Sequence, residues 1–188
     1  MPDDVNIRET PMPSEMHLLL NDYPRDAWES HPSFAKATQN WLGAHKGFRQ
    51  LGRIVRTEAE NYIDKSRAPD EFAARLRYFG DIMVRNLHGH HGWEDRSYFP
   101  ELSAADPRFD PGLEILESDH RTLDATLDGF VDAANRVIML IQLDEKEARK
   151  NAASLLDSAT SIERLLERHL ADEEDLAVPI ILHHKLRG

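Results

Sequence analysis

The sequence predicts an all-α protein, an up-down-up-down four-helix bundle with an N-terminal arm. Four long stretches place apolar residues at alternating steps of three and four, which is typical of helices that bury one face. Short breaks rich in Asp, Pro or other turn-forming residues separate these stretches. No sustained two-residue alternation indicates strands. Four helices joined by short connections form an antiparallel bundle.

Composition narrows the class of protein. The chain has 188 residues, of which 40% are apolar and 30% charged, as expected for one globular domain. No run of about 18 apolar residues predicts a membrane span, and the N-terminus lacks the features of a signal peptide, so we expect a cytoplasmic protein. The net charge of −11 argues against nucleic acids and anionic membranes as partners. Without cysteine, any metal must be held by histidine and carboxylate, which suits Fe, Mn or Zn.

Residues 1–30 form the predicted arm, and residues 31–188 form the predicted bundle domain. The arm contains several prolines and little periodicity, so we expect an extended segment that packs on the bundle. The residues expected to make that contact are Leu18, Leu19, Tyr23 and Trp28.

The four apolar stripes follow in order along the rest of the chain. They run over residues 34–55, 79–94, 113–141 and 155–180. Pro69 suits the first turn of the second helix. Before the fourth helix, Asp144 and Glu147 have the spacing of a capping box.

One histidine interrupts each stripe, and on two stripes a glutamate follows four residues later. Residues four apart lie about 40° apart around a helix, so each His–Glu pair should point into the bundle. Buried polar groups are costly unless they are paired or bind a metal, and two cations could be shared by all six. The alternative is that the histidines are ordinary hydrogen-bonded core residues. The six candidate ligands are His45, His90, Glu94, His120, His169 and Glu173.

The second and fourth helices repeat one frame. In HHGWEDRSYFP and HLADEEDLAVP, a glutamate follows a histidine by four residues and a proline follows the glutamate by six. We expect Pro100 and Pro179 to bend or end their helices just beyond the ligands.

This arrangement resembles the hemerythrin-like family, the His-His-Glu cation-binding domain, over residues 31–184. That family places a His on the first helix, H-x-x-x-E on the second, a His on the third, and H-x-x-x-E or H-x-x-x-D on the fourth. The resemblance implies two iron ions joined by an oxo or hydroxo group, with zinc or manganese as substitutes. It assigns His45 and His90 to one ion, His120 and His169 to the other, and Glu94 and Glu173 to both.

Asp124 marks a departure from the oxygen-carrying members. They carry a second histidine four residues after that of the third helix, where this chain has Asp124. Asp124 could bind metal, accept a hydrogen bond from His120, or face water. A carboxylate here makes sensing, oxidative chemistry or storage more plausible than reversible oxygen carriage.

The neighbouring polar residues are expected at the surface. His88, His91 and Asp95 are placed 60° or more from His90 and Glu94 around the helix, so we expect them at the surface or the rim of the bundle. A weaker second site at His91 and Asp95 is an alternative. Glu174 is expected on an acidic outer face.

The resemblance implies a protein that binds or senses dioxygen, nitric oxide or peroxide at a di-iron site. Two alternatives remain open, a di-iron oxidoreductase that acts on peroxide or nitric oxide, and an interaction module stabilised by a redox-inert metal. The sequence assigns no catalytic residue and leaves the oligomeric state open.

Overall fold

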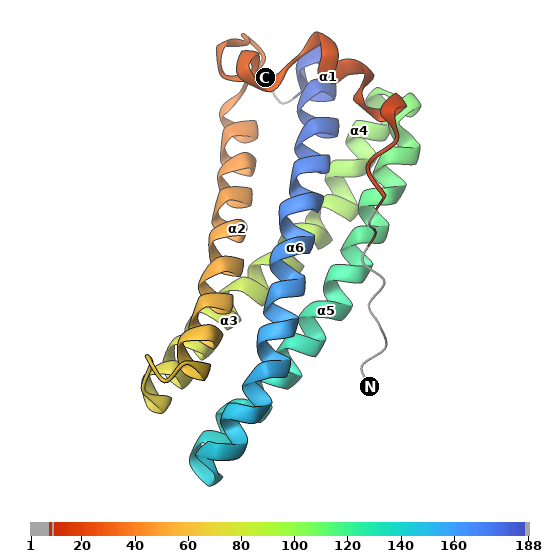
Figure 1. Cartoon of the computed structure of the whole chain (residues 1–188). Coiled ribbons are helices and arrows are strands. Elements are labelled where there is room, and N and C mark those ends of the chain that lie inside the picture. Colours follow the sequence, from red (N-terminus) through yellow and green to blue (C-terminus); the bar gives the residue numbers. More distant parts are fainter. Residues whose placement is uncertain (1–7, 9, 187–188) are drawn as a thin grey trace.

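The computed structural model describes residue 8 and residues 10–186, and this part of the chain is helical with no strand. The all-α bundle predicted from the sequence is therefore confirmed (Figure 1). The start of the predicted arm, residues 1–7 and 9, lies outside the described residues. None of the described helices combines the length and the apolar character needed to cross a membrane. The four long helices are α2 (Lys36–Ile63), α3 (Pro69–Trp93), α5 (Asp110–Leu143) and α6 (Glu145–His184).

The long helices form a closed ring. Helix α2 packs on α3 and α6, and α5 packs on the same two helices. Figure 1 shows α5 and α6 side by side and running in opposite directions, because only Asp144 separates them. Side chains from all four helices therefore meet along one axis.

The predicted helix starts are partly confirmed. Pro69 occupies the first turn of α3. The Asp144 side chain accepts hydrogen bonds from the backbone N–H groups of Lys146 and Glu147 and caps α6. The Glu147 side chain instead pairs with Lys150, 2.6 Å away, so only half of the capping box forms.

Helix α3 continues beyond the predicted stripe through a π-helical turn, Glu94–Tyr98, into α4 (Phe99–Ala105). The N–H of Phe99 bonds to the carbonyl of Glu94, five residues earlier. Pro100 thus lies in the first turn of α4, and Pro179 lies inside α6, which continues to His184. The alternative that these prolines end their helices is wrong, because the chain stays helical past both.

The arm consists of short helical turns. These are Ser14–His17, α1 (Leu18–Asp22) and Arg25–Ser30, and in Figure 1 they cross the end of the bundle where α6 finishes. Leu19 and Trp28 are buried, as expected. Leu18 is 54% exposed, so its predicted contact is wrong. The reason is helical geometry, since adjacent residues of α1 point about 100° apart.

Two apolar clusters fill the bundle. One lies toward the α2–α3 and α5–α6 connections, and the other lies beneath the arm. Along α2, α3 and α5 the histidine falls between them, and on α6 His169 lies where the first cluster ends. On α2, for example, Trp41 belongs to the arm-side cluster and Phe48 to the other, with His45 between. The polar residues therefore form one layer across the bundle.

Candidate metal centre

Seven side chains from the four long helices and the π-helical turn form two donor groups in this layer. Within each group, one donor atom per residue lies within 4.8 Å of every other. The six ligands predicted on the apolar stripes belong to these groups, Asp124 does not, and the seventh member is His91. Their role as metal ligands stays a prediction, but the convergence on which it depends is present. The first group contains His45, His90, Glu94 and Glu173, and the second contains His91, His120 and His169.

The first group joins α2 to the end of α3. The Nε2 atoms of His45 and His90 are 3.0 Å apart, and Nε2 of His90 is 2.9 Å from Oε1 of Glu94. Two nitrogens bound at right angles to one metal, each at about 2.1 Å, would be about 3.0 Å apart. The spacing of the two imidazoles therefore fits a shared cation.

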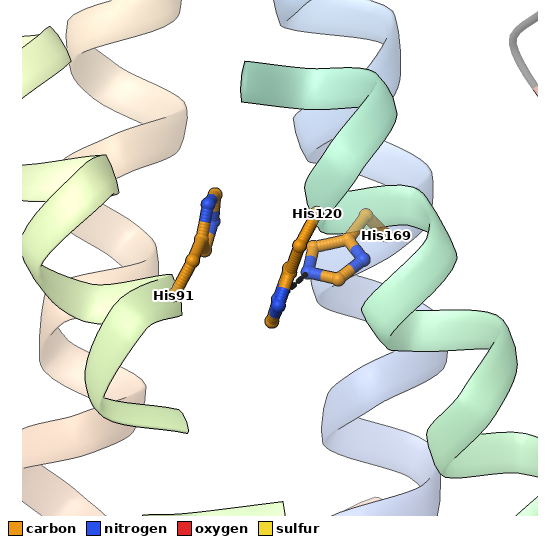
Figure 2. Close-up of side chains that lie close together, drawn as sticks. All are labelled: His91, His120 and His169. Atoms are coloured by element: carbon orange, nitrogen blue, oxygen red, sulfur yellow. Dashed lines mark hydrogen bonds between the residues drawn. The ribbon is translucent and has the colours of Figure 1, made fainter. Parts of the chain in front are cut away.

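The second group contains three imidazoles (Figure 2). His91 projects from α3 toward His120 of α5 and His169 of α6. The Nε2 atoms of His120 and His169 are 3.1 Å apart, and the His91 and His120 rings stack with centroids 4.2 Å apart. This spacing equally fits one cation.

The prediction that His91 lies at the surface or rim is wrong, because the residue is only 1% exposed. Near the centre, α3 packs against both α2 and α5. Adjacent residues of a helix point about 100° apart, so His90 faces His45 of α2 while His91 faces His120 of α5.

Glu94 joins the two groups. Its Oε1 lies 2.9 Å from His90 Nε2, and its Oε2 lies 3.6 Å from His120 Nε2. The indole N–H of Trp41 donates to Oε1 at 2.7 Å and holds the carboxylate in place. Each oxygen thus serves a different group.

Glu173 occupies the corresponding position on α6. Its Oε2 lies 3.5 Å from Nε2 of His45 and 3.7 Å from Nε2 of His169. Both of its oxygens are buried and accept no hydrogen bond from a donor among the described residues. A buried carboxylate without a donor is costly, and a shared cation would remove this cost.

Burial and charge shape the pKa values of the centre. Burial and the neighbouring Glu94 carboxylate raise the pKa of Glu173 well above its usual range. Burial also lowers the pKa of His91 to about 4 and that of His169 to about 3. At neutral pH these two imidazoles are therefore neutral, the form in which histidine binds a metal.

A carboxylate lies behind each of four imidazoles. Such a partner accepts the ring N–H, fixes the tautomer and orients the other nitrogen toward a metal. Asp119 and Asp124 lie slightly beyond hydrogen-bonding distance, whereas Glu174 and Asp95 are within it. The Nδ1 distances are 3.1 Å for His45 to Glu174, 2.7 Å for His120 to Asp95, 3.7 Å for His169 to Asp119 and 3.7 Å for His91 to Asp124.

Asp124 lies outside both donor groups. Its side chain is 45% exposed, and its Oδ1 is 3.1 Å from His88 and 3.7 Å from His91. It therefore stands behind His91 and not, as one sequence interpretation had it, behind His120. His91 thus brings a fifth imidazole to the polar layer from α3, whereas position 124 of α5 carries a carboxylate.

Glu174 is not on an outer face, and that prediction is wrong. It is 5% exposed, because α2 and the arm cover it with His45, Arg49 and Arg25. The apolar pattern of α6 does not predict that Glu174 is buried. The arm shows no periodicity from which its contact with this residue could be predicted. Asp95 does lie near the surface, yet it reaches His120.

A surface pocket of about 410 Å³ opens beside the first group, between α2 and α3. Gly47, Gly89 and His90 line it. A side chain at either glycine would find open space around its Cβ atom, so the pocket is wide at this level. Among the residues of the two donor groups, His90 is the one that lines this pocket.

The family model for the hemerythrin HHE cation binding domain matches residues 36–181. No curated protein and no solved structure matches the chain.

Proposed function

Since the chain belongs to the hemerythrin HHE cation-binding family, we propose that it holds a pair of iron ions and uses them to bind or sense dioxygen or a related small oxidant. One observation carries the proposal. Glu94 directs one oxygen to each of two histidine groups, the arrangement required of a residue that bridges two ions.

The donor set suits iron. Five imidazoles and two glutamate side chains form a mixed nitrogen and oxygen environment, which iron, manganese and zinc accept and which Cu(I) does not prefer. Seven donors exceed the four of a tetrahedral zinc site and suit a bridged pair. We infer that His45 and His90 hold one ion, that His91, His120 and His169 hold the other, and that Glu94 and Glu173 hold both.

A pair of iron ions would supply an exchangeable coordination position and electrons for a small oxidant. The chain itself does the rest. The first group has two imidazoles and the second has three, so the open position belongs on the first ion, beside the pocket at His90. The apolar clusters on either side of the layer exclude water from the remaining faces.

Metal analysis and an optical spectrum test the proposal. Protein loaded anaerobically with Fe(II) should contain about two ions per chain and develop near-ultraviolet absorption on exposure to dioxygen. Zinc-loaded protein serves as the control and should not change. Iron binding without any spectral response to dioxygen, nitric oxide or peroxide would favour a metal-stabilised interaction module instead.

A further inference from the structure

Two of the carboxylates behind the histidines are held in the same way. Glu174 contacts His45, Arg49 of α2 and Arg25 of the arm. Asp119 contacts His169, Arg168 of α6 and Arg8 of the arm.

Each carboxylate therefore has one histidine, one arginine of the bundle and one arginine of the arm. The two sets lie on different donor groups, since His45 belongs to the first and His169 to the second.

The guanidinium of Arg25 contacts both α6 and another residue of the arm. Its Nη1 lies 2.8 Å from Glu174, its Nε lies 2.6 Å from Asp175, and its Nη2 donates to the carbonyl of Ala171 at 3.0 Å. Its guanidinium also lies over the ring of Trp28, 5.1 Å from the centroid. Trp28 belongs to the arm and is buried, so Arg25 ties the arm to the carboxylate behind His45.

Arg8 makes the matching contact on α5. Its Nη2 and Nε lie 2.9 and 3.3 Å from the two oxygens of Asp119, and its Nη2 also lies 2.5 Å from Asp172. Asp119 is 4% exposed, so this forked contact engages a buried carboxylate. A guanidinium that binds both oxygens restricts their rotation more than a single contact does.

We propose that the N-terminal arm is a clamp on the metal centre, in which Arg8 and Arg25 are positioning residues that act through Asp119 and Glu174 on His169 and His45. The inference rests on the proposed function. The arginines hold Glu174 within hydrogen-bonding distance of Nδ1 of His45 and hold Asp119 3.7 Å from Nδ1 of His169, and they offset the charge of both carboxylates. The Nε2 atoms then stay directed at the cations.

The clamp couples arm docking to metal binding. Losing a partner behind a ligating histidine typically weakens metal affinity about 10- to 100-fold. Because coupling between two equilibria is reciprocal, metal should in turn hold the arm in place. The arm is thereby part of the metal centre, although none of its residues is a ligand.

Equilibrium competition for Co(II) against a chromophoric chelator tests the clamp in the full chain. Arg8→Met and Arg25→Met should each weaken Co(II) binding about 10-fold or more, and the double variant should weaken it further. Methionine keeps much of the apolar stem, so the loss reports on the guanidinium. Arg25→Lys keeps the charge and should recover part of the affinity.

Arg67→Met is the matched control. Arg67 binds Glu58, a carboxylate that is 4% exposed and is also bound by Arg75, with no metal-site histidine in that set. This variant should be less stable but should bind Co(II) as the wild type does. Circular dichroism of each variant establishes that it is folded.

Hydrogen exchange of residues 10–30 provides the second measurement. Co(II) should slow exchange of the arm in the wild type, and this effect should be lost in the double variant. Affinities within about twofold of the wild type, with arm exchange indifferent to Co(II), would overturn the clamp while leaving the proposed function intact. Failure of the wild type to bind Co(II) would overturn both.

Discussion

His88 and His91 lie three residues apart on α3, yet their surroundings are opposite. The His88 side chain is 40% exposed, whereas His91 is buried, with its ring stacked on His120 and near His169. Only the second is within reach of a shared metal. This pair makes the assignment of the fifth imidazole directly testable.

His91→Ala should lower the metal content below about two ions per chain, because the second ion loses one of its three imidazole ligands. His88→Ala is the control and should retain both ions. Metal content measured by inductively coupled plasma mass spectrometry checks the pair. Equal metal content in the two variants would show that His91 is an ordinary core histidine and not a metal ligand.

Substitution of either proposed bridging residue should reduce metal binding more than substitution of the carboxylate at position 124. Glu94→Ala or Glu173→Ala removes a group placed between both donor sets, so both ions should be lost. Asp124→Asn should retain metal with an affinity lowered about 10-fold, as for a partner that only orients a ligand. Titration with Fe(II) under anaerobic conditions measures the difference. Retention of both ions by Glu173→Ala would remove its bridging role.

Most of the site was predictable from the spacing of His and Glu along the stripes, and His91 was not. The six predicted side chains follow the 3.6-residue period of one buried face. His91 lies off that face, and its position in the helical period predicts that it is exposed to solvent. It is buried because α3 has two neighbours at this level, a fact of the three-dimensional packing. The adjacent pair His90–His91 was the one available signal.

At the scale of single elements, the π-helical turn is the main feature that the sequence did not predict. It begins at Glu94, so the proposed bridging residue and Asp95 lie in the first part of a wider turn. Such turns are frequent at functional sites. The arm was only partly predictable. Leu19 and Trp28 are buried as expected, but the contacts of the arm with Glu174 and Asp119 depend on two arginines that belong to no periodic pattern. The four long helices were clear because each shows several turns of the apolar stripe.

The cap of α6 was predicted and can be tested. Asp144→Ala removes the acceptor of two backbone N–H groups, so the free energy of unfolding should fall by about 1 kcal/mol. Asp144→Asn keeps an acceptor and should remain within a few tenths of the wild type. Urea denaturation measures both. Equal losses in the two variants would indicate that the charge, and not the cap, is important.

At the scale of the whole molecule, the polar layer makes the metal-free protein sensitive to acid. The pKa of His91 falls from 6.5 unfolded to about 4 folded, and that of His169 falls to about 3. Between pH 6.5 and these lower pKa values, the unfolded chain binds more protons than the folded chain does. The free energy of unfolding therefore decreases as the pH falls through this range. Each histidine contributes up to about 1.4 kcal/mol per pH unit.

Glu173 has the opposite effect on stability. Its pKa is raised in the folded state, so the folded chain binds this proton more readily and is stabilised as the pH falls. Burial also lowers the pKa of His45, so three histidines oppose one glutamate. The metal-free protein should therefore lose stability on going from pH 7 to pH 5. Thermal melts of the chelated wild type and of His169→Gln measure this loss. The variant should show a shallower dependence on pH, and equal slopes would contradict the prediction.

Asp95 connects the buried centre to bulk solvent. Its carboxylate is 40% exposed and lies 2.7 Å from Nδ1 of the buried His120. A proton can therefore pass between bulk solvent and the edge of the centre across a single hydrogen bond, without water entering the apolar layers. In the proposed iron centre, proton movement across this hydrogen bond would compensate for electron gain or loss. The midpoint potential of the iron-loaded protein should thus vary with pH, and Asp95→Asn should flatten that variation.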